Sequence, residues 1–377
     1  KLVLWKDSPA HDSDAERICN KLGIEYLEID RQEEFRNEIV RYFIETYEKG
    51  ETPNPCVRCN RRIKFASLLE IADQIGAYYV ATGHYADVRR NETTGRYELH
   101  RSPSMKDQTY ALAQLTQDQL ARIRMPLSGL RSKDETRRIA ATIDADISSK
   151  SDSQEICFIP NDDYLDFLKR HGHGSVPGEI VYEGASVASH PGIESFTIGQ
   201  RKGLGITFGK PVYVVDIDAD NRRVTLGSNE DLISKQLLAE QANFIAIADI
   251  PASGSIECFA KIRYSATPAK CRLRYATPDM AEAPAASSTG TPRLLVEFDT
   301  PQRAVTPGQV IVFYTTPDLA CTLQPEDAPR ATSVLGSAII ANRNAQRELR
   351  SRQRVRTGGA NTTVRDKLPP IFSSNMI

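Results

Sequence analysis

A change near residue 160 in the spacing of apolar and turn residues constrains the fold of this sequence more than any other feature. Before it, segments with helical spacing of apolar residues alternate with short apolar runs, such as a helix at 14–22 followed by a strand at 24–29. Strands that alternate with helices predict a parallel sheet covered on both faces. After it, short β-rich runs separated by turn residues predict a small closed or nearly closed barrel.

We therefore expect an α/β protein with four segments. Residues 1–160 form a Rossmann-like domain that is truncated at its start, because residues 1–5 read as the end of a buried strand. Residues 161–235 form a small β-rich central domain, and residues 236–342 form a C-terminal β-barrel. Residues 343–377 carry eight Arg or Lys against two acids, with almost no apolar pattern, which predicts a disordered basic tail.

Composition narrows the class of protein. The chain has 377 residues and a formal net charge of −1, so any nucleic acid must be bound by local basic patches. No segment approaches the ~20 apolar residues that a membrane span requires. Seven cysteines without framework spacing indicate a reducing compartment and thiol chemistry.

Two of these cysteines, Cys56 and Cys59, lie in a proline-containing basic stretch at 52–65. Pro53 and Pro55 favour extended backbone, so this stretch is predicted not to be helical. The helix that follows is expected to begin with Asn60 as its N-cap. Cys59 then lies at a helix N-terminus among arginines, where the helix dipole and the cations both stabilise a thiolate.

Three other interpretations of the pair stay open. Half of a zinc site is one, although zinc then needs the distant Cys157 and His84 as further ligands. A thioredoxin-like redox pair is another, although the surrounding prolines and cations do not match that turn. Two buried thiols are the usual default for cysteine. A catalytic thiol leads, because the loop is polar and prolyl on both sides.

Local signals mark further candidates. Gly83 and His84 follow the strand predicted at 77–81, at the edge where open α/β sheets bind ligands. Composition alone makes Cys157, between Ile156 and Phe158, more typical of a core than of a site. Capping boxes are predicted at Thr116-x-x-Gln119 and Ser132-x-x-Glu135, a hairpin turn at 218–221, and a mobile insert at 280–292.

Seven motifs in one order resemble the tRNA-specific 2-thiouridylases, which put sulfur on the wobble uridine of certain tRNAs. The resemblance spans nearly the whole chain. It is carried by Asn54 to Phe65, Ala81-Thr82-Gly83-His84-Tyr85, Lys106-Asp107-Gln108, Ile156-Cys157-Phe158-Ile159, Gly199-Gln200-Arg201-Lys202-Gly203-Leu204-Gly205, Arg263-Tyr264 and Val305-Thr306-Pro307-Gly308-Gln309.

The resemblance implies an adenine-nucleotide-hydrolase-type fold and a two-stage reaction. ATP, with Mg²⁺, adenylates the uridine C2 oxygen, and a cysteine persulfide loaded by a sulfur-donor protein supplies the sulfur. By motif match Cys157 carries the persulfide and Cys59 is the second catalytic cysteine, so that the reaction ends in a Cys59–Cys157 disulfide. Gly83 lies against ATP. The residues expected to contact tRNA are Asn54, Pro55, Cys56, His84, Lys106, Asp107, Gln108, Arg263, Tyr264 and Gln309.

Two features depart from the family. Cys56 stands where many relatives have Asp, and the Ser-Gly-Gly-Val-Asp-Ser-type pyrophosphate loop is absent from these 377 residues. Two alternatives remain, a non-catalytic tRNA-binding relative that lost its ATP loop and another ATP pyrophosphatase that shares only the α/β domain. The paired Cys59 and Cys157 argue against both, and the C-terminal barrel argues against the second. We expect no structural metal, no membrane contact, and a location in the cytoplasm or an organelle.

Overall fold

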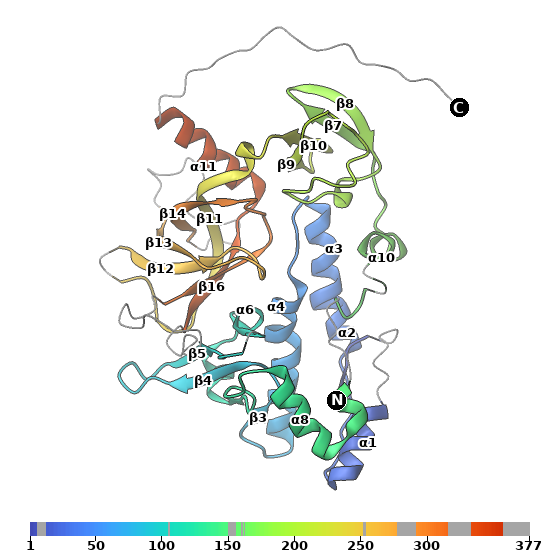
Figure 1. Cartoon of the computed structure of the whole chain (residues 1–377), viewed down its shortest axis with the longest axis vertical. Helices are drawn as coiled ribbons and strands as arrows, with labels where there is room; N and C mark the ends of the chain where they lie inside the picture. The colour runs from blue at the N-terminus through green and yellow to red at the C-terminus, as the bar shows by residue number, and fades with distance from the viewer. Residues whose placement is uncertain are drawn as a thin grey trace.

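The computed structural model describes residues 1–5, 13–104, 106–149, 156–159, 161, 163–251, 254–276, 292–315 and 333–356. Three parts follow one another along the chain (Figure 1). An N-terminal α/β part lies below a small β-sheet domain and beside a β-barrel, and the expected fold class is confirmed. The predicted insert at 280–292 lies almost entirely outside the described residues.

The N-terminal part contains short parallel strands and long helices. β1 (Leu2–Val3) pairs with β2 (Ile29–Asp30), and β3 (Val80–Ala81) pairs with β6 (Ile123–Arg124), both in parallel. These are two separate two-stranded sheets among the described residues, where the sequence predicted one sheet. An antiparallel hairpin, β4 (Ala86–Arg90) with β5 (Tyr97–Arg101), follows β3.

Helices supply most of this part. They are α1 (Ser13–Leu22), α2 (Gln32–Phe35), the π-helical turn η1 (Arg36–Val40), α3 (Arg41–Glu48), α4 (Pro55–Cys59), the π-helical turn η2 (Asn60–Lys64), α5 (Phe65–Gln74), α6 (Thr109–Leu112), α7 (Gln117–Ala121), α8 (Lys133–Ile143), α9 (Ala145–Ser149) and α10 (Tyr164–Arg170). The capping box at α7 is confirmed, since both of its hydrogen bonds form. At α8, Ser132 Oγ accepts from the Glu135 amide at 3.3 Å, while the Glu135 carboxylate accepts from the amide of Arg131 rather than of Ser132.

The stretch predicted to be extended is helical, so that prediction was wrong. α4, η2 and α5 follow without a break from Pro55 to Gln74. Pro55 is tolerated because it occupies the first turn, where its missing N–H has no helical partner to lose. Asn54, not Asn60, is the N-cap, and its Oδ1 accepts from the Val57 amide at 3.4 Å. Asn60 is buried, and its side chain donates to the Ala111 carbonyl at 2.9 Å.

The central domain is a four-stranded sheet in the order β8-β7-β10-β9. Its strands are β7 (Gly178–Tyr182), β8 (Ala185–His190), β9 (Tyr213–Asp218) and β10 (Arg223–Gly227), with the short 3₁₀ turns η4 (Ile193–Ser195) and η5 (Glu230–Leu232). The predicted hairpin turn joins β9 to β10 antiparallel, and Asp218 accepts from the Asn221 amide at 3.1 Å.

The C-terminal part is a closed barrel in the order β11-β14-β13-β12-β15-β16. Its strands are β11 (Ile233–Phe244), β12 (Ile256–Lys261), β13 (Ala269–Tyr275), β14 (Leu294–Arg303), β15 (Val310–Tyr314) and β16 (Val334–Ile340). Closure pairs every strand on both sides, which removes the exposed edges of an open sheet. The predicted barrel is confirmed.

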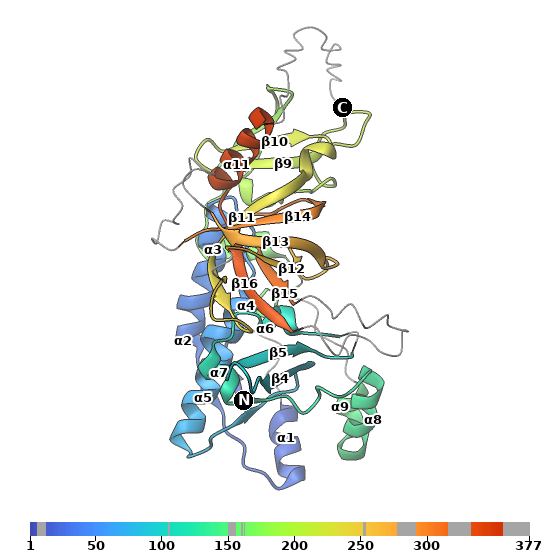
Figure 2. The ribbon, with the colours of Figure 1, turned by 90° about the vertical axis from the view of Figure 1, so that its left-hand side faces the viewer.

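The start of the predicted disordered tail is instead a helix, α11 (Arg343–Arg356). Arg343 donates to Asp216 at 2.7 Å and to Asp218 at 2.6 Å, both on β9. Ala345 and Leu349 pack with apolar residues of the barrel, among them Leu238, Ala276 and Leu295. α11 thus lies against both the barrel and the central domain (Figure 2).

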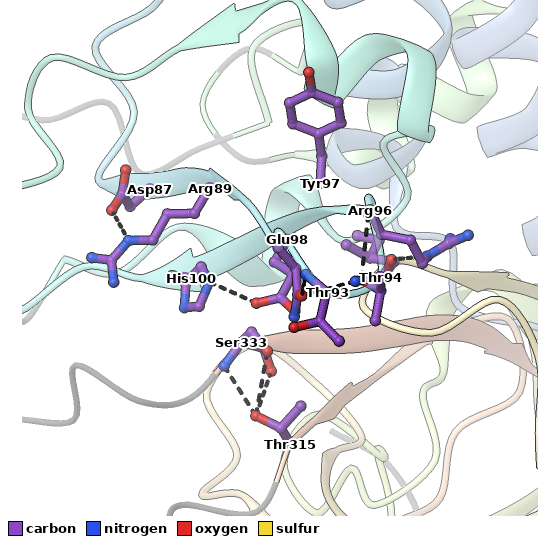
Figure 3. A network of polar contacts seen from close by, with 12 residues as sticks. Asp87, Arg89, Thr93, Thr94, Arg96, Tyr97, Glu98, His100, Thr315 and Ser333 are labelled. Atoms are coloured by element: carbon purple, nitrogen blue, oxygen red, sulfur yellow. Dashed lines mark hydrogen bonds and ion pairs between the residues drawn. The ribbon is translucent and has the colours of Figure 1, made fainter.

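The barrel and the N-terminal part share one hydrophobic core. Val57 and Phe65 of the α4–α5 helix belong to the same buried cluster as Val310, Val312 and Tyr314 of β15. The hairpin β4–β5 rests on the barrel (Figure 3), where His100 forms an isolated antiparallel bridge with Ser333. The Arg96 side chain donates to the carbonyls of Phe244 and Ile245 at 3.1 and 2.8 Å. The N-terminal part and the barrel are therefore packed as one unit.

Candidate active site

The first turn of α4 presents the two cysteines of the basic stretch differently. Pro55 and the Asn54 cap fix the start of the helix, and Cys56 and Cys59 follow one turn apart on one face. Cys56 is exposed, whereas the Cys59 side chain is buried at 4% exposure among Phe35, Phe43 and Ile63. The helix therefore offers one accessible thiol and one protected thiol.

Cys59 is not the stabilised thiolate that the sequence predicted. It lies at the end of α4, away from the helix N-terminus, and burial raises its pKa to about 12. Arg58 is directed to α2–α3 instead, where its guanidinium donates to the Glu38 carboxylate at 2.9 Å and stacks over Tyr42 at 4.8 Å. The nearby ammonium of Lys64 opposes the effect of burial but does not outweigh it.

Cys157 lies on a segment anchored beside Cys59. Phe158 and Ile159 are buried in the same hydrophobic cluster as Cys59, and Ile156 packs against that cluster. The Phe158 ring makes edge-on contacts with Phe35 and Phe43, each with ring centroids 5.4 Å apart. Cys157 itself is exposed. The core position that composition favoured for Cys157 is wrong, because its neighbours occupy the core and turn its thiol outward.

One cation, Lys64, acts electrostatically on all three thiols. Both thiols reach the surface, but the protein packed around them partly desolvates them and raises the pKa of Cys56 and of Cys157, and in both cases the Lys64 ammonium acts in the opposite direction. A charge on Cys157 or Cys56 raises the pKa of Cys59, as expected for thiols that share one neighbourhood. Lys64 was not among the predicted site residues. It lies eight residues after Cys56, about two helical turns later, which was the available signal, and the expectation of an extended backbone concealed it.

The charge of Lys64 also acts on His84. Burial, assisted by Lys64, lowers the pKa of His84 to about 4, so its imidazole is neutral at pH 7. Its Nδ1 is 2.9 Å from Thr82 Oγ1, and its ring packs on Phe65 with centroids 5.7 Å apart. The neighbouring Gly83 is exposed, and a Cβ added there meets only Leu127, at 3.6 Å. The backbone of Gly83 is therefore accessible to a ligand.

The motif Lys106-Asp107-Gln108 is largely tied to its own surroundings. The side-chain oxygen of Gln108 accepts from the backbone amide of Tyr85 at 2.9 Å, and the backbone amide of Gln108 donates to the Tyr85 carbonyl at 3.0 Å. The Asp107 carboxylate accepts from Arg101 at 3.2 Å and from the Thr109 hydroxyl at 2.9 Å. These contacts fix the loop that leads from β5 into α6, and Lys106 stays exposed on it.

Barrel residues reach the same region. The Gln309 side chain donates to the carbonyls of Thr52 and Pro53 at 3.1 and 3.2 Å. Gly308 has φ +84°, and an added Cβ meets the Thr52 carbonyl oxygen at 2.9 Å, so only glycine fits this approach. The barrel thus holds the residues that lead into α4.

An exposed aromatic side chain and several cations line this side of the barrel. Tyr264 is 55% exposed and makes an edge-on contact with Tyr110, with centroids 5.8 Å apart. The Lys261 ammonium lies 5.5 Å from the Tyr264 ring centroid, and Arg263 donates to the Arg303 carbonyl at 3.2 Å. A separate hollow of about 60 Å³ lies between the α4–η2 helix and the barrel, and Asn54, Arg58, Arg61 and Arg62 contribute to its lining.

Two further properties of the described residues concern metal binding and membrane insertion. Among the residues that the structure describes, no three or more His, Cys, Asp or Glu side chains are arranged to hold a metal ion. Within the same described ranges, no helix combines the length and apolar character needed to cross a membrane.

Comparison with known sequences matches the chain almost end to end. Residues 6–161 match the tRNA methyl transferase HUP domain, residues 165–228 the tRNA methyl transferase PRC-barrel domain, and residues 234–340 the aminomethyltransferase beta-barrel domain. α11 follows the last of these ranges.

Named relatives agree with these domain matches. The tRNA-specific 2-thiouridylase MnmA of Clostridioides difficile is 42% identical over 304 residues, covering 80% of each chain. That of Heliobacterium modesticaldum is 44% identical over 305 residues, covering 80% of this chain and 75% of the relative. The Solibacter usitatus protein of the same name is 43% identical over 309 residues, covering 80% of each. The chain belongs to the tRNA-specific 2-thiouridylase family.

Proposed function

We propose that this protein is a tRNA-uridine 2-sulfurtransferase in which Cys157 carries a persulfide and Cys59 is the second catalytic cysteine. The observation that carries the proposal is the anchoring of Cys157 beside Cys59, since Phe158 and Ile159 are buried in the cluster that contains Cys59. An exposed thiol can be loaded by a persulfide-donor protein, and a buried neighbour can then act on the loaded sulfur.

The sulfur chemistry has two routes that end alike. In one, Cys59, once deprotonated, attacks Sγ of the Cys157 persulfide and releases hydrosulfide; the hydrosulfide attacks C2 of the activated uridine, and AMP leaves with the former C2 oxygen. In the other, the terminal persulfide sulfur attacks C2 first and AMP leaves in the same way. Cys59 then attacks Sγ of Cys157 and displaces the sulfur bound to C2 as the thiocarbonyl forms. Either route leaves a Cys59–Cys157 disulfide, and an external dithiol must reduce it before the next cycle.

The activation stage needs ATP with Mg²⁺. When bound, ATP supplies the adenylyl group that turns the uridine C2 oxygen into a good leaving group. Gly83 is the residue of this chain that we assign to the nucleotide, because its exposed backbone follows β3 at the carboxyl edge of a parallel pair. The family's pyrophosphate loop is not within residues 1–377, so we expect this chain alone not to release pyrophosphate from ATP.

The tRNA contacts are assigned around the start of α4. Asn54, Pro55 and Cys56 frame the target base, and Arg61 and Arg62 line the adjacent hollow, where they suit phosphate oxygens. His84 packs on Phe65 of the same helix, and Gln309 contacts the carbonyls of Thr52 and Pro53 just before it. Lys106-Asp107-Gln108, Arg263 and the exposed Tyr264 extend the surface towards the body of the tRNA, where aromatic stacking and cations are typical of RNA recognition.

Mild oxidation followed by peptide mapping tests the thiol assignment without ATP. In a Cys56→Ser variant, whose remaining site thiols are Cys59 and Cys157, we expect a crosslink between these two residues, which requires Cα atoms within about 7 Å. We also expect no stoichiometric zinc in the purified protein by elemental analysis. One zinc per chain, with Cys59 protected from alkylation by the metal, would contradict the sulfur-transfer role.

A non-catalytic tRNA-binding relative is the second candidate. Fusing the corresponding N-terminal residues of the Clostridioides difficile relative to this chain separates the two candidates. A sulfurtransferase then adenylates and thiolates tRNA, whereas a binding protein binds tRNA and does neither.

A further inference from the structure

Cys56 has no assigned part in the sulfur chemistry, yet it is the more accessible thiol of the α4 pair. It is the second residue of α4, and Asn54 and Pro55 hold that turn in place. Cys59, three residues later, is 4% exposed. Residues i and i+3 of a helix have Cα atoms about 5 Å apart, which lies within the range that a disulfide bridges.

The end product of the proposed reaction creates a problem of access. In a Cys59–Cys157 disulfide, the Cys59 sulfur is shielded by the cluster of Phe35, Phe43 and Ile63. A bulky reductant therefore reaches only the Cys157 sulfur, and attack there must expel Cys59, whose pKa burial raises to about 12. Thiols of high pKa are poor leaving groups. Direct reduction of this disulfide is expected to be slow.

An attacking thiol that already lies beside Cys59 avoids both obstacles. Cys56 approaches Cys59 along the helix face, within the protein, and attack at the Cys59 sulfur expels Cys157 instead. Lys64 acts on both Cys56 and Cys157, so a cation stands next to the attacking and the leaving sulfur.

We propose that Cys56 is a resolving cysteine that opens the Cys59–Cys157 disulfide by exchange within the helix. The proposal rests on the proposed function, which supplies that disulfide. The Cys56 thiolate attacks the Cys59 Sγ, the Cys56–Cys59 bond forms, and the Cys59–Cys157 bond breaks. The electron pair leaves on Cys157, which takes up the proton that Cys56 lost, so no oxidant is consumed.

The exchange has a functional consequence. Cys157 returns to a free thiol and can accept the next persulfide before the protein is fully reduced. The remaining Cys56–Cys59 disulfide exposes its Cys56 sulfur to an external dithiol, and because attack there also expels Cys59, full reduction is a slow step that follows the release of Cys157. This assigns a role to the residue that replaces Asp at this position of the family motif.

Disulfide mapping of three chains tests the proposal. The full chain, its Cys56→Ser variant and a Cys19→Ser control are oxidised with one equivalent of diamide and mapped after alkylation. We expect mainly a Cys56–Cys59 link with Cys157 alkylated in the unmodified chain and the control. We expect a Cys59–Cys157 link in Cys56→Ser, and its opening by glutathione, measured as free Cys157 thiol, to be at least about tenfold slower than the release of Cys157 in the unmodified chain.

The outcomes separate this proposal from the function on which it rests. If the unmodified chain keeps a Cys59–Cys157 link with Cys56 free, the exchange is wrong while the sulfur-transfer assignment stands. The same holds if Cys157 is released as fast in Cys56→Ser as in the unmodified chain. If Cys56→Ser forms no Cys59–Cys157 link, the proposed function itself is contradicted. A Cys56→Ala variant with the same behaviour as Cys56→Ser shows that the serine hydroxyl plays no part.

Discussion

Two groups of cysteines in this protein invite comparison. In the barrel, Cys258 and Cys271 face each other on β12 and β13 with their sulfur atoms 3.6 Å apart. They are 0% and 1% exposed, within an apolar cluster. At the candidate site, Cys56 and Cys157 are exposed and Cys59 alone is buried. The pair whose sulfur atoms are in contact is thus the pair that solvent and substrate cannot reach.

The difference shows that closeness of two sulfurs is not enough for thiol chemistry. Hydrogen bonding to Cys258 and burial raise the pKa of Cys271, and the charges acting on it come from Cys258 and Asp299, with no cation among them. Lys64 acts on every thiol of the candidate site, and two of those thiols reach the surface. Access and a neighbouring cation distinguish a reactive cluster from a packed pair.

The largest expected effect is on thiolation by a chain that includes the pyrophosphate loop. Cys59→Ser and Cys157→Ser are expected to lower single-turnover thiolation by at least about 10³-fold, because each removes a sulfur that the reaction uses. The affinity for tRNA is expected to stay within a few-fold.

Matched controls come from the two cysteine groups. Cys258→Ala is expected to keep thiolation and to lower the free energy of unfolding by about 1–2 kcal/mol, since it leaves a small cavity. Cys56→Ser retains most single-turnover activity, because resolution follows sulfur transfer. A Cys56→Ser variant as inactive as Cys59→Ser would show that the motif match assigned the catalytic role to the wrong cysteine of the pair.

Alkylation by iodoacetamide sharpens the comparison through pH. Cys56 and Cys157 are expected to react first, and Cys59 far more slowly, because with a pKa of about 12 only on the order of 10⁻⁴ of it is thiolate at pH 8. Its rate rises about tenfold per pH unit until the pH approaches 12. Cys258 and Cys271 react only when urea unfolds the barrel. Mass spectrometry of the modified peptides measures all five rates, and early labelling of Cys258 would break the comparison.

The smallest effect concerns Lys64. The Lys64→Gln substitution removes a cation that opposes the raised pKa of each site thiol. Because less of Cys157 is then thiolate, its alkylation at pH 8 should slow by about two- to fivefold. The pKa of His84, which Lys64 helps to lower, should rise from about 4. NMR titration of His84 measures this shift. Labelling of the barrel pair in urea serves as the control and is expected not to change.

The structure makes a further prediction about acid stability. The folded-state pKa of His84 is about 4, below the ordinary 6.5, so the unfolded chain binds more protons between these values. The stability tied to neutral His84 is complete above pH 6.5 and is lost as the pH falls to 4. His84→Gln should therefore weaken the pH dependence of unfolding in this window by on the order of 1 kcal/mol, measured by urea titration. An unchanged dependence would contradict the buried, neutral imidazole.

Much of the fold followed from local sequence signals. Strands separated by turn residues predicted the barrel, and the turn at 218–221 predicted the β9–β10 hairpin, because alternation and turn chemistry are local properties. The capping box of α7 was equally local. For the site, the order of motifs indicated which cysteines matter. The assignment of their roles stays a proposal that the oxidation and substitution experiments test.

What the sequence could not supply were features that depend on distant partners. The helix starts at Pro55 rather than Asn60, because Asn54 caps it and Asn60 finds a partner at Ala111 across the fold. The α11 helix forms on a segment whose composition reads as disordered, because Asp216, Asp218 and the apolar barrel residues around Leu238 receive it.

By itself, then, the sequence determined the architecture, since periodicity and turn residues act within a few positions of one another. Only the tertiary structure decided which thiol is exposed. Cys56 and Cys59 have similar neighbours in the chain, but one faces solvent and the other the cluster of Phe35, Phe43 and Phe158. Burial in that cluster, which outweighs the nearby cations, sets the ionisation of Cys59. The desolvation of a charge depends on everything packed around it, and that packing is fixed only when the whole chain has folded.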